Sequence, residues 1–290
     1  MTGTRALLLL NPRARRGREA GPDLAEALRS HGLDVEAVEI GDAAALPELV
    51  RRRAPDVGRV IVAGGDGTLN AALQGLAGTS TPLAIIPVGT ANNTARALGL
   101  PTETADACRV AAGSLTRPID LGRVNDRWFF TTASLGLSVT VTRLLTGDLK
   151  RRWGRLAYGY AALRATLERR PFYAEILAGE QRLALRTFQI VVGNGRYYGS
   201  ALPVAEDAEI DDGWLDLYAV EARSRWRLVT MVPALKTGRQ GQRPDVHTLR
   251  AREVEIRTRT PRTINVDGEL GPRTPARIIV VPRSLSVFSP

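Results

Sequence analysis

Glycines, a carboxylate and a hydroxyl stand together in the run from Gly64 to Thr68, which reads Gly-Gly-Asp-Gly-Thr. Glycine lacks a Cβ, so its backbone can approach a phosphate closely, and a following helix start offers free N–H groups. Asp66 would repel a bare phosphate unless a divalent cation lay between them. The run therefore predicts a site for metal-bound nucleotide phosphates. The alternative is a glycine-rich turn with Asp66 and Thr68 as helix caps.

A second loop of similar composition follows the next strand-like run and reads Pro-Val-Gly-Thr-Ala-Asn-Asn over residues 87–93. Two such loops on successive parallel strands meet at the carboxyl edge of a sheet, where open α/β sheets bind ligands. The Thr90 hydroxyl can donate to a phosphate, and Asn92 and Asn93 can cap a helix or reach ligand oxygens. The pair of loops favours a ligand site over an isolated turn.

A third loop, residues 11–17, ends the first strand and contains three arginines. These arginines come to the same edge if the first strand is central in the sheet, and a solvated basic turn is the alternative reading.

Paired acids follow near the C-terminal end. Asp267-Gly268-Glu269 places two carboxylates around a glycine, and phosphoryl transfer uses one acid for a metal ion and another to orient an attacking hydroxyl. Asp-Gly between apolar runs is also the commonest hairpin turn, which stays open as an alternative. Asp211-Asp212-Gly213 has the same ambiguity, because it can also be a solvated turn.

The elements that must position these loops alternate between strand and helix patterns in the first 120 residues. The expected strands are 6–10, 35–40, 60–63 and 83–87, and the expected helices are 23–30, 43–53, 69–76 and 94–98. This order predicts a doubly wound α/β domain with parallel strands.

From Trp128 onward the pattern changes to strand-like alternation, with a hairpin turn expected at Gly179-Glu180. The clearest strand patterns are 174–177, 183–192, 215–220, 254–258 and 277–281. A second, antiparallel β domain follows. One helical stretch, 153–169, carries arginines around an apolar stripe, so it either rests on anionic lipid or covers the β domain as a solvated helix.

Composition narrows the class of protein. The 290 residues allow about two domains, and 40 basic against 30 acidic residues give a formal charge of +10, which favours an anionic partner. The arginine runs lack interleaved aromatics, which argues against nucleic acid. The two lysines, Lys150 and Lys236, lie outside any Walker-type phosphate loop. One cysteine, and no apolar run of about 18 residues, predict a cytoplasmic protein without disulfides or a spanning helix.

Six motifs occur in a fixed order. They are Asn11-Pro12, Gly64 to Asn70, Gly89 to Asn92, Gly193-Asn194-Gly195 with Gly199, Asp211-Asp212-Gly213 with Leu215, and Val266-Asp267-Gly268-Glu269. Together they resemble the diacylglycerol kinase catalytic family, which includes bacterial lipid kinases and the sphingosine and ceramide kinases. The resemblance covers nearly the whole chain, and six ordered matches are far more specific than any one of them.

The resemblance implies a fold in two domains. Residues 1–122 would form a nucleotide-binding α/β domain of the phosphofructokinase and NAD kinase type. Residues 123–290 would form an antiparallel β-sandwich for the lipid substrate, and in this family the last strand commonly returns to the first domain. The reaction would occur in the cleft between the two domains.

The resemblance also implies roles for individual residues. ATP would be held by a set of loop residues: Asn11, Gly64, Gly65, Asp66, Gly67, Thr68, Asn70, Gly89, Thr90 and Asn92. Asp66 would organise the catalytic Mg²⁺, and Glu269, with Asp267 beside it, would take the proton of the lipid hydroxyl. Asp212 would bind a structural Mg²⁺ together with backbone carbonyls near Glu209 and Trp214.

The resemblance thus implies an ATP- and Mg²⁺-dependent lipid kinase, with diacylglycerol as the first candidate acceptor and peripheral contact with an anionic membrane. The alternatives are an NAD kinase-like enzyme and a non-catalytic lipid-binding protein on the same scaffold. Phosphofructokinases share the short glycine loop but lack the later motifs. The sequence departs from the family at Asn93, where many members carry Asp, and around Val38 to Ile40, which lacks a threonine that often meets the nucleotide base.

Overall fold

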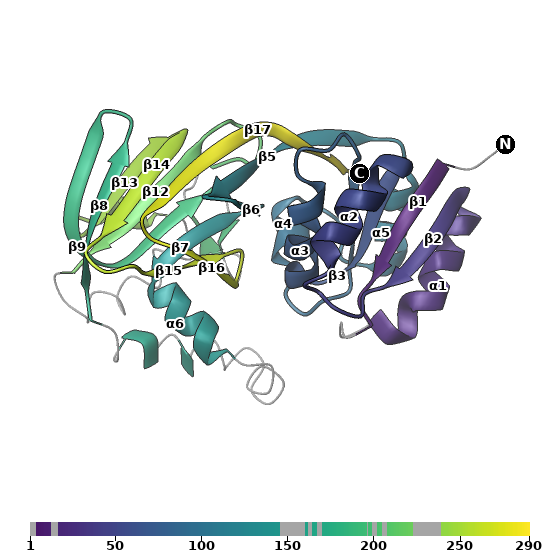
Figure 1. Cartoon of the computed structure of the whole chain (residues 1–290), viewed down its shortest axis with the longest axis horizontal. Coiled ribbons are helices and arrows are strands. Elements are labelled where there is room, and N and C mark those ends of the chain that lie inside the picture. The colour runs from purple at the N-terminus through teal and green to yellow at the C-terminus, as the bar shows by residue number, and fades with distance from the viewer. Residues whose placement is uncertain are drawn as a thin grey trace. The chain divides into compact units, whose positions relative to one another are not determined.

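A computed structural model describes most of the chain. The described residues are 4–12, 17–145, 160–161, 164–166, 170–195, 197–198, 202–204, 208–222 and 239–290. The chain divides into two compact units (Figure 1). Unit 1 is Met1–Leu121 with Val281–Pro290, and unit 2 is Gly122–Val280.

The core of unit 1 is a sheet of four parallel strands in the order β2–β1–β3–β4. Their bounds are β1 Thr4–Leu10, β2 Leu33–Glu39, β3 Arg59–Gly64 and β4 Leu83–Pro87. Every residue of β3 and β4 is buried. Continuous apolar runs of this kind are typical of parallel strands that are covered on both faces.

Helices cover the two faces of this sheet (Figure 1). They are α1 Gly17–Ser30, α2 Leu46–Arg53, the 3₁₀ turn η1 Ala54–Asp56, α3 Asp66–Leu76, α4 Asn93–Ala97 and α5 Thr104–Ala112. Leu24 and Leu28 of α1 share one apolar cluster with Ala107 and Cys108 of α5. α2 approaches α3 closely, because a Cβ at Gly75 would lie 2.1 Å from the Pro47 carbonyl oxygen.

The last strand, β17 (Ala276–Phe288), runs through both units. It pairs with β14 (Glu253–Thr258) in unit 2, and farther along Val287 pairs with Leu83 of β4 in unit 1. Arg59 fixes its end: the guanidinium donates to the carbonyls of Ala111 (2.6 Å) and Gly113 (3.0 Å) and lies 4.3 Å from the Phe288 ring. Burial lowers the pKa of Arg59.

Unit 2 is built from antiparallel strands around a second apolar core. Its main sheet runs β16–β15–β7–β9–β8–β14–β17, β12 pairs with both β9 and β13, and β5 pairs with β6 and β17. The bounds are β5 Thr116–Val124, β6 Arg127–Phe129, β7 Thr132–Gly136, β8 Phe172–Ala178, β9 Gln181–Gly193, β12 Leu215–Glu221, β13 Val246–Ala251, β15 Thr263–Val266 and β16 Glu269–Arg273. β10 Tyr197–Tyr198 and β11 Leu202–Pro203 form a separate pair, α6 spans Leu137–Leu144, and η2 spans Gln240–Gln242.

The fold class predicted from the sequence is confirmed: a doubly wound α/β unit is joined to an antiparallel β unit. The predicted hairpin turn is present, since Ala178 pairs with Gln181 and Gly179 has a φ of 60°. The predicted helix 153–169 lies outside the described residues, apart from 160–161 and 164–166. Among the helices that are described, none is long and apolar enough to span a membrane.

Candidate functional site

The two glycine loops contact each other at the edge of the unit 1 sheet. β3 and β4 are neighbours, and Val88 N donates to the Gly64 carbonyl (3.2 Å). A Cβ at Gly89 would lie only 2.5 Å from the Gly65 Cα, and one at Gly64 would overlap the Thr68 side chain at 2.6 Å. The glycines therefore allow the loops to pack on each other and on α3, besides leaving the backbone open to a ligand.

Asp66 connects the two loops through its carboxylate. One oxygen accepts from Thr94 N (2.9 Å), and the other accepts from Asn93 N (3.1 Å) and from the Asn93 side-chain amide (3.4 Å). Asp66 thus caps α4, the helix after the second loop, whereas α3, which it begins, has no side-chain cap. The alternative, in which Asp66 and Thr68 cap the helix that follows them, is therefore wrong about the helix, because Asp66 caps α4 and Thr68 lies within α3.

Asp66 offers one carboxylate ligand that a divalent cation could share with phosphate oxygens. A carboxylate offers about four acceptor positions, of which the three contacts above use three, and Mg²⁺ prefers carboxylate oxygens. Asp66 is half-buried, and Gly67 and Thr90 beside it are exposed. The uncapped first turn of α3 also leaves backbone N–H groups for an anion.

The asparagines of the nucleotide motifs mainly hold the loops in shape. Asn92 has a left-handed backbone (φ 50°), and its side chain accepts from Gly89 N (3.0 Å) and donates to the Gly89 carbonyl (3.2 Å). Asn11 donates to the Thr68 hydroxyl (2.7 Å), which connects the first loop to α3. Asn70 is buried within α3. The arginines at 13, 15 and 16 lie outside the described residues, as does Gly199.

In unit 2, Asp267 and Gly268 form the turn of the β15–β16 hairpin. Val266 pairs with Glu269, and both turn residues have positive φ, 48° and 92°. This is the two-residue turn that Asp-Gly favours. Glu269 is consequently the first residue of β16, and its side chain is exposed. In the described part of the chain the exposed Glu269 carboxylate has no hydrogen bond or ion pair.

The Asp267 carboxylate turns inward. It accepts hydrogen bonds from Phe130 N (2.7 Å), Thr131 N (3.0 Å), the Thr131 hydroxyl (2.8 Å) and Thr132 N (2.9 Å). Burial raises the pKa of Asp267, and these hydrogen bonds act in the opposite direction. Asp267 therefore anchors the β15–β16 hairpin to residues 130–132, and Glu269 lies on this hairpin.

Residues 130–132 were not singled out by the sequence analysis. Besides Asp267, they bind the Gly-Asn-Gly motif: Asn194 N donates to the Thr131 carbonyl (2.8 Å), and the Asn194 side chain donates to the Phe130 carbonyl (2.9 Å). Two motifs far apart in the sequence thus meet on one short segment. Its own sequence, Phe-Thr-Thr, has no feature that would have indicated this role.

The Asp212 loop brings together the three residues predicted for a structural metal. The Asp212 carboxylate accepts from Trp214 N (2.9 Å) and Glu209 N (3.4 Å), and Arg250 Nη2 lies 2.5 Å from it. Arg250 is also 3.6 Å from the Asp216 carboxylate. Asp212 therefore already has a cationic partner. Across the described residues, no group of three or more His, Cys, Asp or Glu side chains could hold a metal ion.

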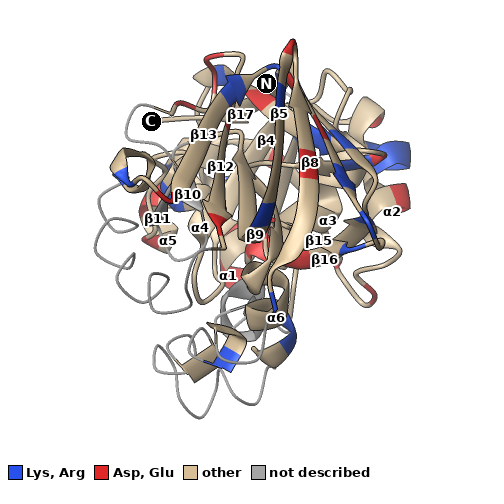
Figure 2. Ribbon diagram, turned by 90° about the vertical axis from the view of Figure 1, so that its left-hand side faces the viewer, with Lys and Arg blue, Asp and Glu red and all other residues tan. Residues whose placement is uncertain are grey.

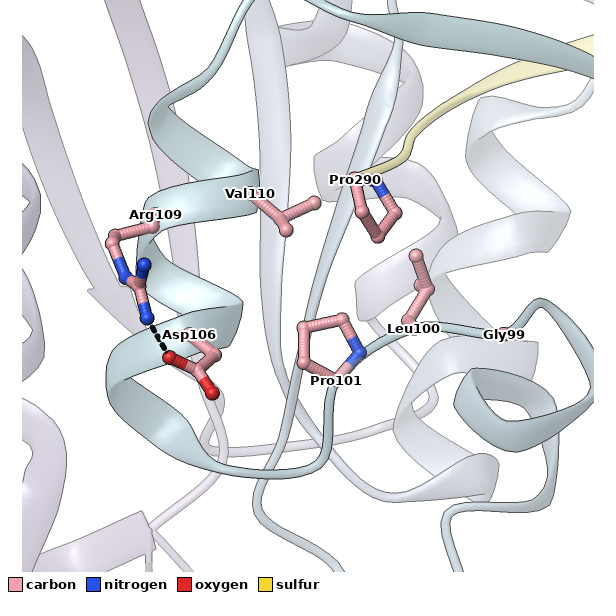
Figure 3. A pocket seen from close by; sticks show the side chains of 7 residues that line it. All are labelled: Gly99, Leu100, Pro101, Asp106, Arg109, Val110 and Pro290. Atoms are coloured by element: carbon pink, nitrogen blue, oxygen red, sulfur yellow. Dashed lines mark hydrogen bonds and ion pairs between the residues drawn. The ribbon is translucent and has the colours of Figure 1, made fainter.

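A separate cavity of about 360 Å³ lies in unit 1 (Figure 3). The residues lining it are Gly99, Leu100, Pro101, Asp106, Arg109, Val110 and Pro290. Asp106 and Arg109 form an ion pair at its side (Figure 3). None of the residues predicted to bind the nucleotide lines this cavity.

The chain matches two protein-family descriptions. Residues 5–124 match the diacylglycerol kinase catalytic domain, and residues 131–289 match the YegS C-terminal NAD kinase beta sandwich-like domain. A crystal structure of a putative diacylglycerol kinase from Bacillus anthracis has a similar fold, with a TM-score of 0.87 and 24% identity, covering 100% of this chain and 96% of that one.

Curated relatives are similar over nearly their whole length. A diacylglycerol kinase of Mycobacterium tuberculosis is 36% identical over 276 residues, which cover 91% of this chain and 87% of the relative. One from Staphylococcus saprophyticus is 31% identical over 302 aligned positions, covering 99% and 95%. With the glycine loops, Asp66 and the Glu269 hairpin in place, the chain belongs to the diacylglycerol kinase family of ATP-dependent lipid kinases.

Proposed function

We propose that the protein transfers the γ-phosphoryl group of ATP to the hydroxyl of diacylglycerol. The observation that carries this proposal is the Asp66 carboxylate, which joins two contacting glycine loops and keeps an acceptor position for a cation. The choice of acceptor is supported by relatives named diacylglycerol kinase. Because that acceptor is a membrane lipid, the protein would work at the membrane surface.

Unit 1 holds the nucleotide in this proposal. The backbone of Gly64, Gly65, Gly67 and Gly89, the exposed Thr90 and the first turn of α3 bind the phosphates, while Asn11 and Asn92 keep the loops in shape. Asn70 is buried within α3, after that first turn. Asp66 would hold Mg²⁺, which when bound neutralises charge on the phosphate oxygens. Asn93 and Thr94 orient the Asp66 carboxylate for that contact.

Unit 2 supplies the proton acceptor. As the lipid oxygen forms its bond to the γ-phosphorus, the bond from that phosphorus to the bridging oxygen of ADP breaks, and the hydroxyl proton passes to Glu269. Asp267 is a positioning residue, since both of its oxygens are used to hold the hairpin on residues 130–132. Truncating Asp267 would therefore act through the placement of Glu269.

A structural Mg²⁺ at Asp212, with carbonyls near Glu209 and Trp214, is a separate proposal. Such an ion would share the Asp212 carboxylate with Arg250 or displace it. A fall in the melting temperature of the nucleotide-free protein on chelation with EDTA supports this site. An unchanged melting temperature would mean that Arg250, rather than a metal ion, holds the Asp212 loop in place.

The experiment that tests the acceptor incubates the purified protein with ATP, MgCl₂ and one candidate at a time: diacylglycerol, ceramide, sphingosine or NAD. Products are separated by thin-layer chromatography and identified by mass spectrometry. Phosphatidic acid as the main product supports the proposal. Phosphorylation of NAD alone would replace it with an NAD kinase, and no product from any acceptor would favour the non-catalytic alternative.

Asp66→Asn tests the site in unit 1. The amide keeps the size of the side chain but loses the charge that binds a cation, so calorimetry should show loss of Mg²⁺-dependent ATP binding. Asp34→Asn, an exposed position on β2, is the matched control and should bind like the wild type. Unchanged binding in Asp66→Asn would refute the metal role.

A further inference from the structure

Arginines gather around one end of unit 2, where β14 turns into β15 and β8 begins. Arg259 and Arg262 lie in the turn between β14 and β15. Arg143 lies in the last turn of α6, Arg273 ends β16, and Arg170 stands two residues before β8. These five residues are called the basic rim. All except the half-buried Arg262 are exposed.

The contacts of the basic rim converge on one small region. The guanidinium of Arg259 lies 4.8 Å from the Tyr173 ring, and that of Arg262 lies 4.2 Å from the Phe172 ring. Arg273 donates to the Pro261 carbonyl (2.9 Å), and Arg143 donates to the Thr263 hydroxyl (3.4 Å). Four arginines, from α6, β16 and the turn between β14 and β15, are therefore placed around residues 259–263 and the start of β8.

The arginines of the basic rim differ from neighbouring arginines in the groups that they contact. Arg257 is paired with Glu255, and Arg277 is paired with Glu253. Within the described residues, Arg143, Arg259 and Arg273 contact a hydroxyl, an aromatic ring and a carbonyl, and none of them has a carboxylate partner. Their charges remain available to an outside anion. Figure 2 shows the basic residues in blue, including blue on α6.

An exposed aromatic ring, that of Tyr173, lies next to an arginine of the basic rim. Tyr173 is 38% exposed, and its ring lies against the guanidinium of Arg259. Tyrosine next to arginine suits the boundary between lipid headgroups and acyl chains, because the ring is apolar and its hydroxyl and the guanidinium are polar.

We propose that the basic rim is the surface through which the protein docks on an anionic lipid bilayer. Unpaired arginines near such a surface are attracted by its negative potential, each contributing on the order of 1 kcal/mol, or about fivefold in binding. The choice of a bilayer over another polyanion rests on the proposed function, since the acceptor hydroxyl is found in a membrane. A single exposed aromatic also gives no stacking platform for successive bases.

The test measures vesicle binding by sedimentation, without ATP. The wild type should bind phosphatidylcholine vesicles that contain phosphatidylglycerol, should not bind pure phosphatidylcholine vesicles, and should be released by salt. The triple variant Arg143→Gln, Arg259→Gln, Arg273→Gln should bind about a hundredfold more weakly, because three attractions of about fivefold are lost. Equal binding by this variant and the wild type would overturn the proposal.

The control is Arg51→Gln, Arg52→Gln, Arg109→Gln, which removes the same charge from exposed positions on α2 and α5. It should bind vesicles like the wild type, and an equal loss would show that only net charge matters. Thermal melting checks that both variants fold. Stronger binding of the basic rim to duplex DNA than to anionic vesicles would also overturn the proposal.

Turnover separates this proposal from the proposed function. With diacylglycerol in neutral detergent micelles, the basic-rim variant should match the wild type, whereas on phosphatidylglycerol vesicles its turnover should fall with its binding. A wild type that binds vesicles through the rim but phosphorylates no lipid would refute the kinase proposal and leave docking in place. A variant that loses turnover equally in micelles and vesicles would refute docking.

Discussion

At the scale of single residues, the contact between Asp66 and Asn93 explains a departure from the family pattern. Many members carry Asp at this position, and here an amide donates 3.4 Å to the Asp66 carboxylate. Two carboxylates at that separation repel unless a cation lies between them. Asn93 therefore lets the two loops hold together without a metal.

Asn93→Asp should make folding depend on Mg²⁺. We expect the variant to lose about 1–4 kcal/mol of stability in EDTA, since the new carboxylate faces Asp66, and to recover most of it in MgCl₂. Melting curves with and without the ion measure both effects. The control is Asn125→Asp, a turn residue whose side-chain oxygen accepts from Arg277 N and which should show no Mg²⁺ dependence. Equal Mg²⁺ dependence in wild type and variant would contradict the explanation.

Residue types in the sequence were sufficient to single out Asp66, Glu269 and the glycines as candidates, because a short loop after a strand has few uses for such residues. Their partners were not predictable. Asp267 binds residues 130–132, more than 130 positions away, and only the pairing of β15 with β7 brings them together. The spacing of these residues along the chain does not indicate that β15 pairs with β7.

At the scale of elements, the contact between the glycine loops depends above all on the absence of a side chain at Gly89. β3 and β4 run side by side, and their following loops have room for each other because Gly89 lacks a Cβ, which would lie 2.5 Å from the Gly65 Cα, whereas one at Gly65 would lie 3.3 Å from the Gly89 Cα.

Gly89→Ala should push the loops apart. The new Cβ meets backbone 2.5 Å away, so we expect a loss of about 1–3 kcal/mol in unfolding free energy and a marked loss of ATP affinity. Urea unfolding and calorimetry report the two quantities. Gly41→Ala is the control, because a Cβ there meets nothing within 4 Å. ATP affinity that is undiminished in Gly89→Ala would mean that the loop contact does not shape the nucleotide site.

Arg59 performs a similar task for the end of β17. Arg59→Ala removes the charged donor from the Ala111 and Gly113 carbonyls and the cation from the Phe288 ring, which should cost about 1.5–3 kcal/mol. Urea unfolding measures the loss. Arg109→Ala, at an exposed position on α5, should change stability by about 0.5 kcal/mol or less. If both variants unfold alike, Arg59 does not anchor the strand.

At the scale of the whole molecule, hydrophobic pattern was enough to predict the fold class. Continuous apolar runs such as β3 occur where a strand is covered on both faces, and alternating runs such as β14 occur where one face is solvated. Only the family resemblance suggested that the last strand, β17, returns to the first unit. Its pairing with both β14 and β4 depends on partners that no local pattern specifies.

The measurement that tests the account most directly is the turnover of Glu269→Gln with diacylglycerol, MgCl₂ and saturating ATP. We expect turnover to fall about a hundredfold to ten-thousandfold while ATP affinity stays unchanged, because the amide cannot take the hydroxyl proton. Glu180→Gln, an exposed glutamate in another hairpin turn of unit 2, should keep full turnover. Undiminished production of phosphatidic acid by Glu269→Gln would contradict the account.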